Sequence, residues 1–161
     1  MALDIDAPLQ HALEIGYAYL NRRERTVSEV RLALERRGVS AACTEDVIRT
    51  LTGQGFLDDT RFARLFVADK RELEQWGSER IRRGLLSRGI DRDLVQATVD
   101  DPASGEMPES ELGRALALLR RRFPIPPGDR RDRERALGLL LRKGYASEVA
   151  LDAVMAHARD D

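Results

Sequence analysis

Cysteine and histidine are scarce in this sequence of 161 residues, and their scarcity limits the chemistry that it could perform. Cys43 is the only cysteine, so the chain has no internal disulfide and no thiolate metal cluster. The two histidines, His11 and His157, lie near opposite ends and are poor candidates for a nucleophilic triad. Neither a Gly-Lys-Ser/Thr phosphate loop nor a His-Glu-x-x-His motif occurs. The sequence therefore predicts a protein that is not an enzyme and that holds no cofactor and no metal.

Long apolar runs and a basic leader are also missing. No apolar stretch approaches the roughly 18 residues that a membrane-spanning helix needs. The sequence starts with the acidic segment 1–6 and lacks the basic region that opens a secretory signal. We therefore expect a soluble, cytoplasmic protein with no membrane partner.

Lysine is nearly absent although basic residues are abundant. Only two of the 27 basic residues are lysines, and 28 acidic residues bring the formal net charge to -1. Segments 22–37, 61–92 and 120–135 carry an excess of arginine, whereas 45–59 and 93–111 are acidic. This segregation fits basic ridges that bind a polyanion, and it equally fits solvated helix faces with many ion pairs. The arginine bias suits bidentate contacts with phosphate or carboxylate, but a GC-rich genome would also produce it.

Proline is absent from residues 9–101 and 128–161, where apolar residues recur at helical spacing, as in Leu13, Tyr17 and Leu20. Segment 26–29, Thr-Val-Ser-Glu, has the form of a capping box that starts a helix. Other expected N-caps are Thr44, Asp58 or Asp59, Ser78, Asp91, Ser110, Asp129 and Ser147. The pattern predicts helices near 8–24, 27–37, 44–54, 59–75, 79–88, 92–100, 110–123, 130–143 and 147–158.

These helices repeat as a unit of three. A basic residue, a glycine and an apolar residue recur around Gly38, Gly89 and Gly144, where a left-handed residue can end a helix. One such unit is too small to bury much surface, so neighbouring units must stack. The sequence therefore predicts an all-α fold of three tandem three-helix repeats in an elongated, curved array. The expected repeats are 8–54, 55–100 and 110–158, with an acidic linker at 101–109.

The last two helices of each unit resemble a helix-turn-helix, but the third helices carry acids and few side chains that read DNA bases. Basic residues lie mainly on the first and second helices, which suits contact with a nucleic-acid backbone or a protein. The triple arginine 120–122 beside the run 130–133 is the strongest candidate for phosphate contact. Arginines in a last turn also complement the helix dipole, which is a sufficient structural reason for them.

Three sets of motifs occur in order at the repeat spacing. Segment 20–30 contains a Leu-x-x-Arg-x-x-Thr-x-x-Glu-Val stretch. Segment 55–63, Gly-Phe-Leu-Asp-Asp-Thr-Arg-Phe-Ala, precedes 77–81, Gly-Ser-Glu-Arg-Ile, and the later Leu85-x-x-x-Gly89-Ile90. The third unit has Arg121-Arg122-Phe123 and then Leu-Leu-Arg-Lys-Gly-Tyr at 140–145. By these motifs the chain resembles, over nearly its whole length, the RecX family of bacterial regulators of the recombinase RecA. Val30 stands where that family usually has leucine, and Trp76 where tyrosine is common.

The resemblance implies a non-catalytic protein that binds the filament of RecA on single-stranded DNA. It further implies restraint of the filament's ATPase, strand exchange and coprotease activities in recombination, DNA repair and the SOS response. We expect a monomer whose basic ridges reach RecA and single-stranded or duplex DNA. The residues that we expect to face the filament are Arg22, Arg23, Arg25, Arg36, Arg37, Arg80, Arg82, Arg83, Arg120, Arg121 and Arg122. A second set of residues matches the family's motifs, and we expect a structural role for them. These residues are Gly38, Leu57, Asp58, Asp59, Arg61, Phe62, Ala63, Gly77, Ile81, Gly89 and Gly144.

Two other classes of function remain open from the residues alone. An autonomous helix-turn-helix protein would bind bare duplex DNA tightly, with strong salt dependence. A helical-repeat adaptor would bind some other protein with little salt dependence.

Overall fold

The computed structural model describes residues 7–101 and 110–160. Within these two ranges the chain forms nine α-helices and no β-strand, so the all-α prediction is confirmed there. Residues 102–109 of the expected acidic linker lie outside the described part. The helices are α1 (Ala7–Leu20), α2 (Val27–Glu35), α3 (Ala41–Gly53), α4 (Asp59–Glu72), α5 (Ser78–Ser87), α6 (Arg92–Asp100), α7 (Glu111–Arg122), α8 (Arg130–Lys143) and α9 (Ser147–His157).

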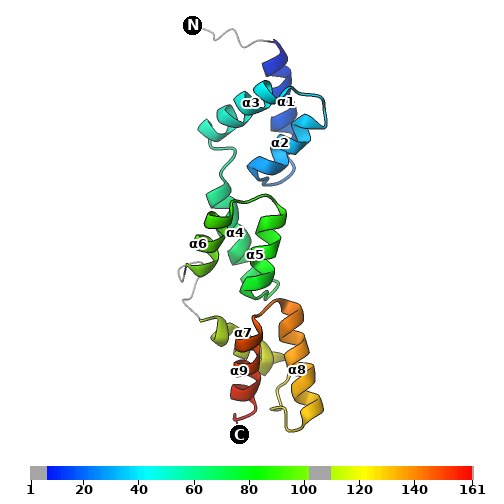
Figure 1. Ribbon diagram of the computed structural model, residues 1–161, viewed down its shortest axis with the longest axis vertical. Helices are drawn as coiled ribbons and strands as arrows, with labels where there is room; N and C mark the ends of the chain where they lie inside the picture. Colours follow the sequence, from blue (N-terminus) through cyan, green and yellow to red (C-terminus); the bar gives the residue numbers. More distant parts are fainter. Residues whose placement is uncertain (1–6, 102–109, 161) are drawn as a thin grey trace.

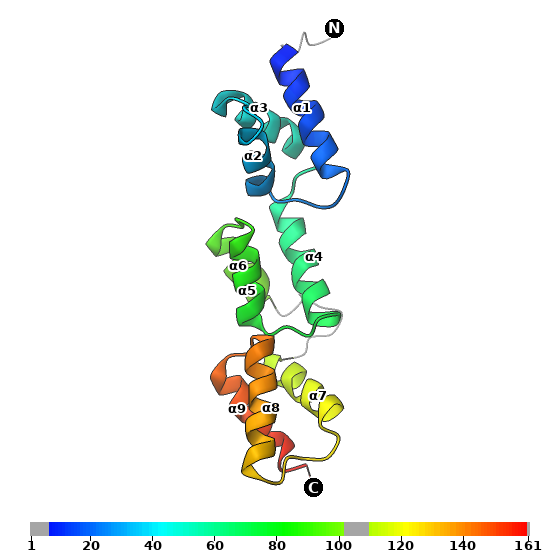
Figure 2. The same cartoon turned by 90° about the vertical axis from the view of Figure 1, so that its right-hand side faces the viewer.

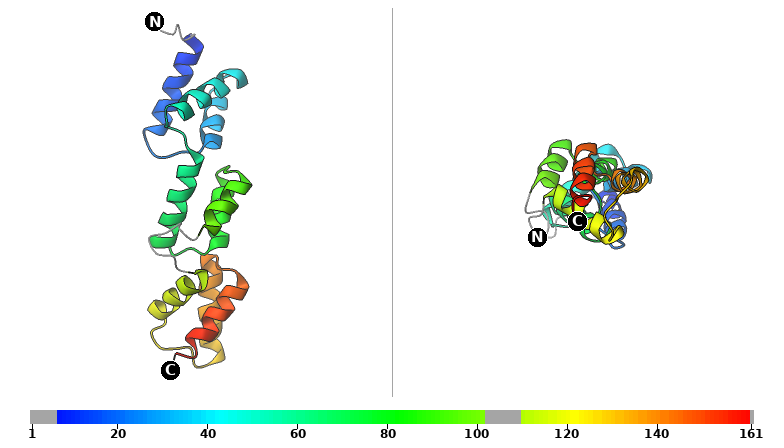
Figure 3. Two further views of the ribbon diagram at one scale, coloured as in Figure 1. Left: turned by 90° about the vertical axis from the view of Figure 1, so that its left-hand side faces the viewer. Right: turned by 90° about the horizontal axis from the view of Figure 1, so that it is seen from below.

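The nine helices form an elongated rod in which three groups of three follow one another along the long axis (Figure 1). Helices α1, α4 and α7 lie along one side of the rod, and α2, α5 and α8 lie along the other (Figure 2). The opposite side view and the end-on view agree that the groups are stacked rather than folded into one globule (Figure 3). The elongated array predicted from the repeat is therefore confirmed.

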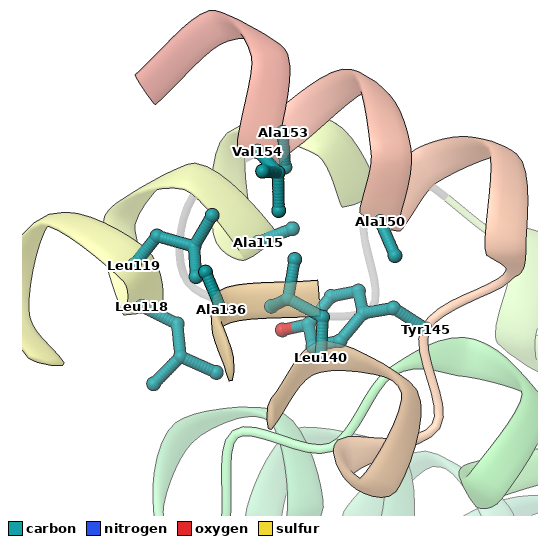
Figure 4. Packing of buried hydrophobic residues seen from close by; sticks show 9 residues of the cluster. All are labelled: Ala115, Leu118, Leu119, Ala136, Leu140, Tyr145, Ala150, Ala153 and Val154. Atoms are coloured by element: carbon teal, nitrogen blue, oxygen red, sulfur yellow. The ribbon is translucent and has the colours of Figure 1, made fainter. Parts of the chain in front are cut away.

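Each group of three helices has its own hydrophobic core. In the third group, Ala150, Ala153 and Val154 of α9 face residues of α7 and α8 (Figure 4). Leu57, which precedes α4, packs into the core of the first group rather than the second. The three sets of buried residues are Ala12, Leu13, Val30, Leu34, Val47, Leu51 and Leu57; Phe62, Ala63, Val67, Ile81, Leu85, Ile90, Val95 and Val99; and Ala115, Leu118, Leu119, Ala136, Leu140, Tyr145, Ala150, Ala153 and Val154.

Most helix starts follow the expected capping chemistry. Thr26 forms the full capping box, because its hydroxyl accepts from the Glu29 N–H while the Glu29 carboxylate accepts from the Thr26 N–H. Asp58, rather than Asp59, caps α4 by accepting from the Arg61 N–H at 2.9 Å. Side chains also cap α6, α7 and α8 as expected, through Asp91, Ser110 and Asp129.

Three expected N-caps are wrong. Helix α3 starts at Ala41, with Ser40 as its cap, so Thr44 lies inside the helix with its hydroxyl buried. Ser78 and Ser147 are the first residues of their helices, and the cap positions belong to Gly77 and Ala146, which offer no side-chain acceptor. The largest differences in length are at the ends of α1 and α4, since α1 ends at Leu20 rather than 24 and α4 at Glu72 rather than 75.

The N-cap and first turn of α2 join the first group to the second. The Thr26 hydroxyl donates to the Arg88 carbonyl at 2.7 Å, and the Val27 N–H donates to the Asp59 carboxylate at 2.9 Å. Glu29 forms an ion pair with Arg88, with 2.7 Å between Oε1 and Nε. Burial raises the pKa of the Asp59 carboxyl above its ordinary value, although the Val27 N–H opposes this shift. The start of α2 is thus seated on the turn that follows α5.

Main-chain groups join the second group to the third. The Gly77 N–H donates to the Lys143 carbonyl at 2.8 Å, and the Glu79 N–H donates to the Gly144 carbonyl at 3.1 Å. A Cβ on Gly144 would lie 2.2 Å from the Cβ of Arg80, so only glycine fits this contact. Gly144 also has φ +89°, in the left-handed region where glycine carries no strain. The start of α5 is thus seated on the turn that follows α8, which repeats the arrangement of the first junction.

Candidate partner-binding surface

Two of the three candidate arginines on α5 lie on one face of the helix. The Arg80 guanidinium stacks on the Trp76 ring, with its Cζ 4.1 Å from the ring centroid, and donates to the Arg142 carbonyl at 3.2 Å. Arg83 is exposed and has no hydrogen-bond or ion-pair partner among the described residues. Arg82 instead pairs with Asp100 of α6, with 2.6 Å between Nη2 and Oδ1. Arg80 and Arg83 therefore share a surface from which Arg82 is separated.

The candidate arginines of the first group fall at opposite ends of α2. Arg22 and Arg23 lie in the connection before α2, and Arg36 and Arg37 lie in the turn after it. All four are exposed, and within the described part of the chain none has a carboxylate partner. Arg25 is half-buried and stacks over Tyr19, with its Cζ 4.1 Å from the ring centroid. Helix α2 therefore separates these residues into two exposed basic clusters.

The three arginines at the end of α7 lie in two different environments. Arg120 forms an ion pair with Asp160 at 2.8 Å, and this contact lowers the pKa of the Asp160 carboxyl. Arg121 and Arg122 are exposed and have no ion-pair partner among residues 7–101 and 110–160. Arg122 lines a groove beside α8, whereas Arg121 does not. The sequence does not distinguish the three residues, because the difference depends on where α8 and the segment after α9 pack.

The sequence-based candidates omit arginines of α8 that the fold brings beside them. Arg122 shares a groove of about 580 Å³ with residues of α8, and Arg80 and Arg83 share one of about 720 Å³. Arg142 lines both grooves, so they meet at the junction between the second and third groups. The sequence analysis noted Arg131 only as part of the run beside 120–122, and it missed Arg135 and Arg142. Arg131, Arg135 and Arg142 are four and seven residues apart, which places them on one face of a helix. This spacing within the predicted helix 130–143 is the signal that could have identified them.

The residues matched to the family's motifs lie in cores, caps and junctions. Leu57, Phe62, Ala63 and Ile81 are buried in cores, and Asp58 caps α4. Arg61 donates to the Gly55 carbonyl at 3.1 Å. Asp59, Gly77, Gly89 and Gly144 lie at the two junctions. Gly38 occupies the equivalent turn of the first group, which no other group of helices covers, and a Cβ there would meet nothing within 4 Å.

The described residues hold no group of three or more side chains suited to bind a metal ion. The His157 ring is buried and its Nε2 donates a hydrogen bond to the Phe123 carbonyl at 2.7 Å. The Tyr145 side chain is also buried. Burial raises the pKa of Tyr145 to about 12, and its hydroxyl donates to the Gln75 carbonyl at 3.4 Å.

In the described part of the chain, no helix combines the length and apolar character needed to cross a bilayer.

Comparison with protein families matches two parts of the chain. The model of the first three-helix domain of RecX matches residues 12–51, and the model of the second matches residues 58–99. These ranges include the buried core residues of the first and second groups of helices except Leu57. Both matches are thus to three-helix units rather than to isolated helices.

Individual proteins extend the similarity to most of the chain. The "Regulatory protein RecX" of Leptothrix cholodnii is 34% identical over 131 residues, which cover 81% of this chain and 79% of that protein. The "Regulatory protein RecX" of Halorhodospira halophila is 33% identical over 143 residues, which cover 88% and 85% respectively. The crystal structure of RecX from Lactobacillus salivarius superimposes with a TM-score of 0.76 at 17% identity, over 94% of this chain and 96% of that one. The family models and the length of these matches show that the chain belongs to the RecX family of regulatory proteins.

Proposed function

We propose that this protein binds the nucleoprotein filament of RecA on single-stranded DNA and restrains its activity without catalysing a reaction. Membership of a family of regulatory proteins named RecX supports this function. The observation that carries the proposal is that exposed arginines with no ion-pair partner among residues 7–101 and 110–160 occur in all three groups of the elongated rod, from Arg22 to Arg122. A rod with charges at several points along its length can follow a fibre better than it can enclose a small molecule.

Charge and shape together favour a partner that combines protein and phosphate. The chain is close to neutral overall, so long-range attraction to bare DNA is weak. Its exposed arginines can still make bidentate contacts with carboxylates of a protein or with phosphates. Where RecA coats DNA, both kinds of acceptor are available to one rod-shaped ligand. The filament is therefore a better match than bare duplex DNA, for which the acid-bearing third helices provide few base contacts.

Binding should be compared on RecA-coated single-stranded DNA, bare single-stranded DNA and bare duplex DNA, each at two salt concentrations. We expect the tightest binding to the coated DNA, together with inhibition of the RecA ATPase. Binding to bare duplex that equals or exceeds binding to coated DNA would instead support a helix-turn-helix DNA-binding protein. Absence of binding to RecA-coated DNA would overturn the proposal.

The double variant Arg36→Glu/Arg37→Glu localises the contact, because both side chains are exposed and unpaired within the described residues. We expect it to bind the coated DNA about tenfold more weakly, as expected for reversal of charges at an interface rim. Its matched control is Arg64→Glu/Arg92→Glu, which changes two other exposed arginines that also have no ion-pair partner in the described part of the chain. Equal effects of the two variants would show a general dependence on charge rather than a contact at residues 36 and 37.

A further inference from the structure

Arginines from α5, α7 and α8 lie along one continuous surface, which we name the α5–α8 arginine groove. Its members are Arg80, Arg83, Arg122, Arg131, Arg135 and Arg142. We propose that this groove is a binding site for the sugar–phosphate backbone of one nucleic-acid strand. The inference deepens the proposed function and rests on it for its biological setting, but the site can be tested in the absence of RecA.

Helical spacing aligns the groove's arginines on both helices. On α5, Arg80, Arg83, Gly84 and Ser87 recur at three and four residues and line the groove of about 720 Å³. On α8, the segment from Arg131 to Arg142 presents the α8 arginines along the groove of about 580 Å³. Eleven residues of α-helix span about 16 Å, so α8 alone offers charges over several nucleotides. Helices α5 and α8 follow one another along the same side of the rod (Figure 2), and Arg142 of α8 lines both grooves.

The charges of this surface are available to a ligand. Arg83, Arg122, Arg131 and Arg142 have no carboxylate partner within the described residues. One acidic side chain, Glu134, also lines the groove of about 580 Å³, and it forms an exposed pair with Arg130 at 2.8 Å. Arg135 lies 3.5 Å from Asp132, a contact between exposed side chains that contributes little. An excess of arginine with few acids to neutralise it attracts a polyanion and releases its counterions.

The aromatic side chains beside the groove pack against cationic side chains, so their faces are not free to stack on bases. Arg80 stacks on the Trp76 ring, which also contacts Phe66 edge-on and has the Lys70 ammonium 4.9 Å from its centroid. A Cβ on Gly84 would lie 2.9 Å from the Phe66 ring, so glycine is needed for this close packing. Because the Trp76 ring is already in contact with two cations, it is poorly placed to stack on a base. The groove should therefore bind phosphates without sequence preference.

A single file of charges in a groove matches one strand better than a duplex or an acidic polypeptide. Proteins that hold single strands use a basic groove that tracks the backbone, with site sizes of roughly 4–16 nucleotides. A duplex presents two strands across its minor groove, whereas these arginines line grooves that share Arg142. The guanidinium fork also makes bidentate contacts with phosphate. The carboxylates of an acidic polypeptide could also bind these guanidinium groups, so poly-glutamate is tested as a competing ligand.

The test measures the binding of full-length protein to a labelled oligo(dT) of about 20 nucleotides by fluorescence anisotropy over a range of salt. The double variant Arg131→Gln/Arg142→Gln removes two exposed charges of the groove, and Arg64→Gln/Arg92→Gln removes two exposed charges elsewhere. For the groove variant we expect about a tenfold loss of affinity, and a salt slope smaller by about 1.4, because each lost phosphate contact contributes about 0.7. For the control we expect nearly the affinity of the unmodified protein. Circular dichroism should show unchanged helicity in both.

Three results would overturn the groove as a single-strand site. One is the absence of oligo(dT) binding by the unmodified protein at low salt, and another is an equal loss in the groove and control variants. The third is equal or tighter binding of duplex DNA or poly-glutamate, lost in the same variant. None of these results concerns RecA, so they are distinct from failure of the proposed function, which would appear as no binding to RecA-coated DNA.

Discussion

The two junctions of the rod have the same arrangement but use different chemistry. In each, the start of the second helix of one group is seated on the glycine turn that ends the second helix of the next. The first junction relies on side chains, chiefly the Thr26 hydroxyl and the ion pair of Glu29 with Arg88. The second relies on the main chain, through the N–H groups of Gly77 and Glu79. Repetition of a backbone geometry thus preserves the stacking while the side chains at each junction differ.

Both junctions exclude an added Cβ, but only the second places main-chain atoms directly against it. A Cβ on Gly77 would lie 2.4 Å from the Gly144 carbonyl oxygen, and a Cβ on Gly144 would lie 2.2 Å from the Arg80 Cβ. At the first junction, a Cβ on Gly89 would meet the Ser28 side chain at 2.3 Å, whereas the Ser28 Cα lies 3.9 Å away. Rotation of Ser28 about χ1 would move its Oγ but not its Cβ, so the first junction also excludes a Cβ at Gly89. At the second junction main-chain atoms themselves lie within 3 Å of an added Cβ.

The largest effect is expected for Gly144→Ala. This change places a methyl group against the backbone of α5 and imposes left-handed strain at φ +89°. We expect about 3 kcal/mol of destabilisation, from backbone strain of 1–2 kcal/mol and overpacking of 1–3 kcal/mol. Urea unfolding measures this change.

Gly38→Ala is the matched control for that prediction. Gly38 has a similar φ of +77°, but a Cβ there meets no atom within 4 Å, so only strain of about 1 kcal/mol is expected. If the two variants lose the same stability, close contact at the second junction contributes nothing to the stability of the rod.

A smaller effect is expected for Thr26→Ala at the first junction. The variant loses an N-cap and a hydrogen bond to the Arg88 carbonyl, together worth about 2 kcal/mol. Ser110→Ala serves as control, because Ser110 caps α7 by accepting from the Gly113 N–H and should cost about 1 kcal/mol. The loss of stability in Thr26→Ala minus the loss in Ser110→Ala gives the contribution of the hydrogen bond across the junction. Equal losses in the two variants would show that this hydrogen bond does not stabilise the junction.

Local patterns were sufficient to predict the helices and the repeat. The capping box at Thr26 and the left-handed glycines depend on residues close together in the sequence, and both are present as expected. Thr44 was misplaced as a cap because Ser40 satisfies the same local rule four residues earlier. Sequence alone does not decide between two adequate caps when packing determines which residue is buried.

The surface was harder to predict than the fold, because pairing between arginines and acids depends on the packing of distant segments. Arg82 and Arg83 are neighbours in sequence, yet Asp100 pairs with Arg82 while Arg83 lines a groove. Arg142 joins the residues of α5 only because the third group is seated on the second. A count of arginines locates the basic segments, but the availability of each charge requires the stacked arrangement of the helices.

Small-angle X-ray scattering of the full chain tests the stacked rod most directly. A compact domain of 161 residues would have a radius of gyration of about 15 Å. The stacked arrangement predicts a clearly larger radius and a distance distribution with the long tail of a rod, both unchanged between low and high salt. A radius near 15 Å with a symmetric distance distribution would contradict the account, because the three groups would then form one globule.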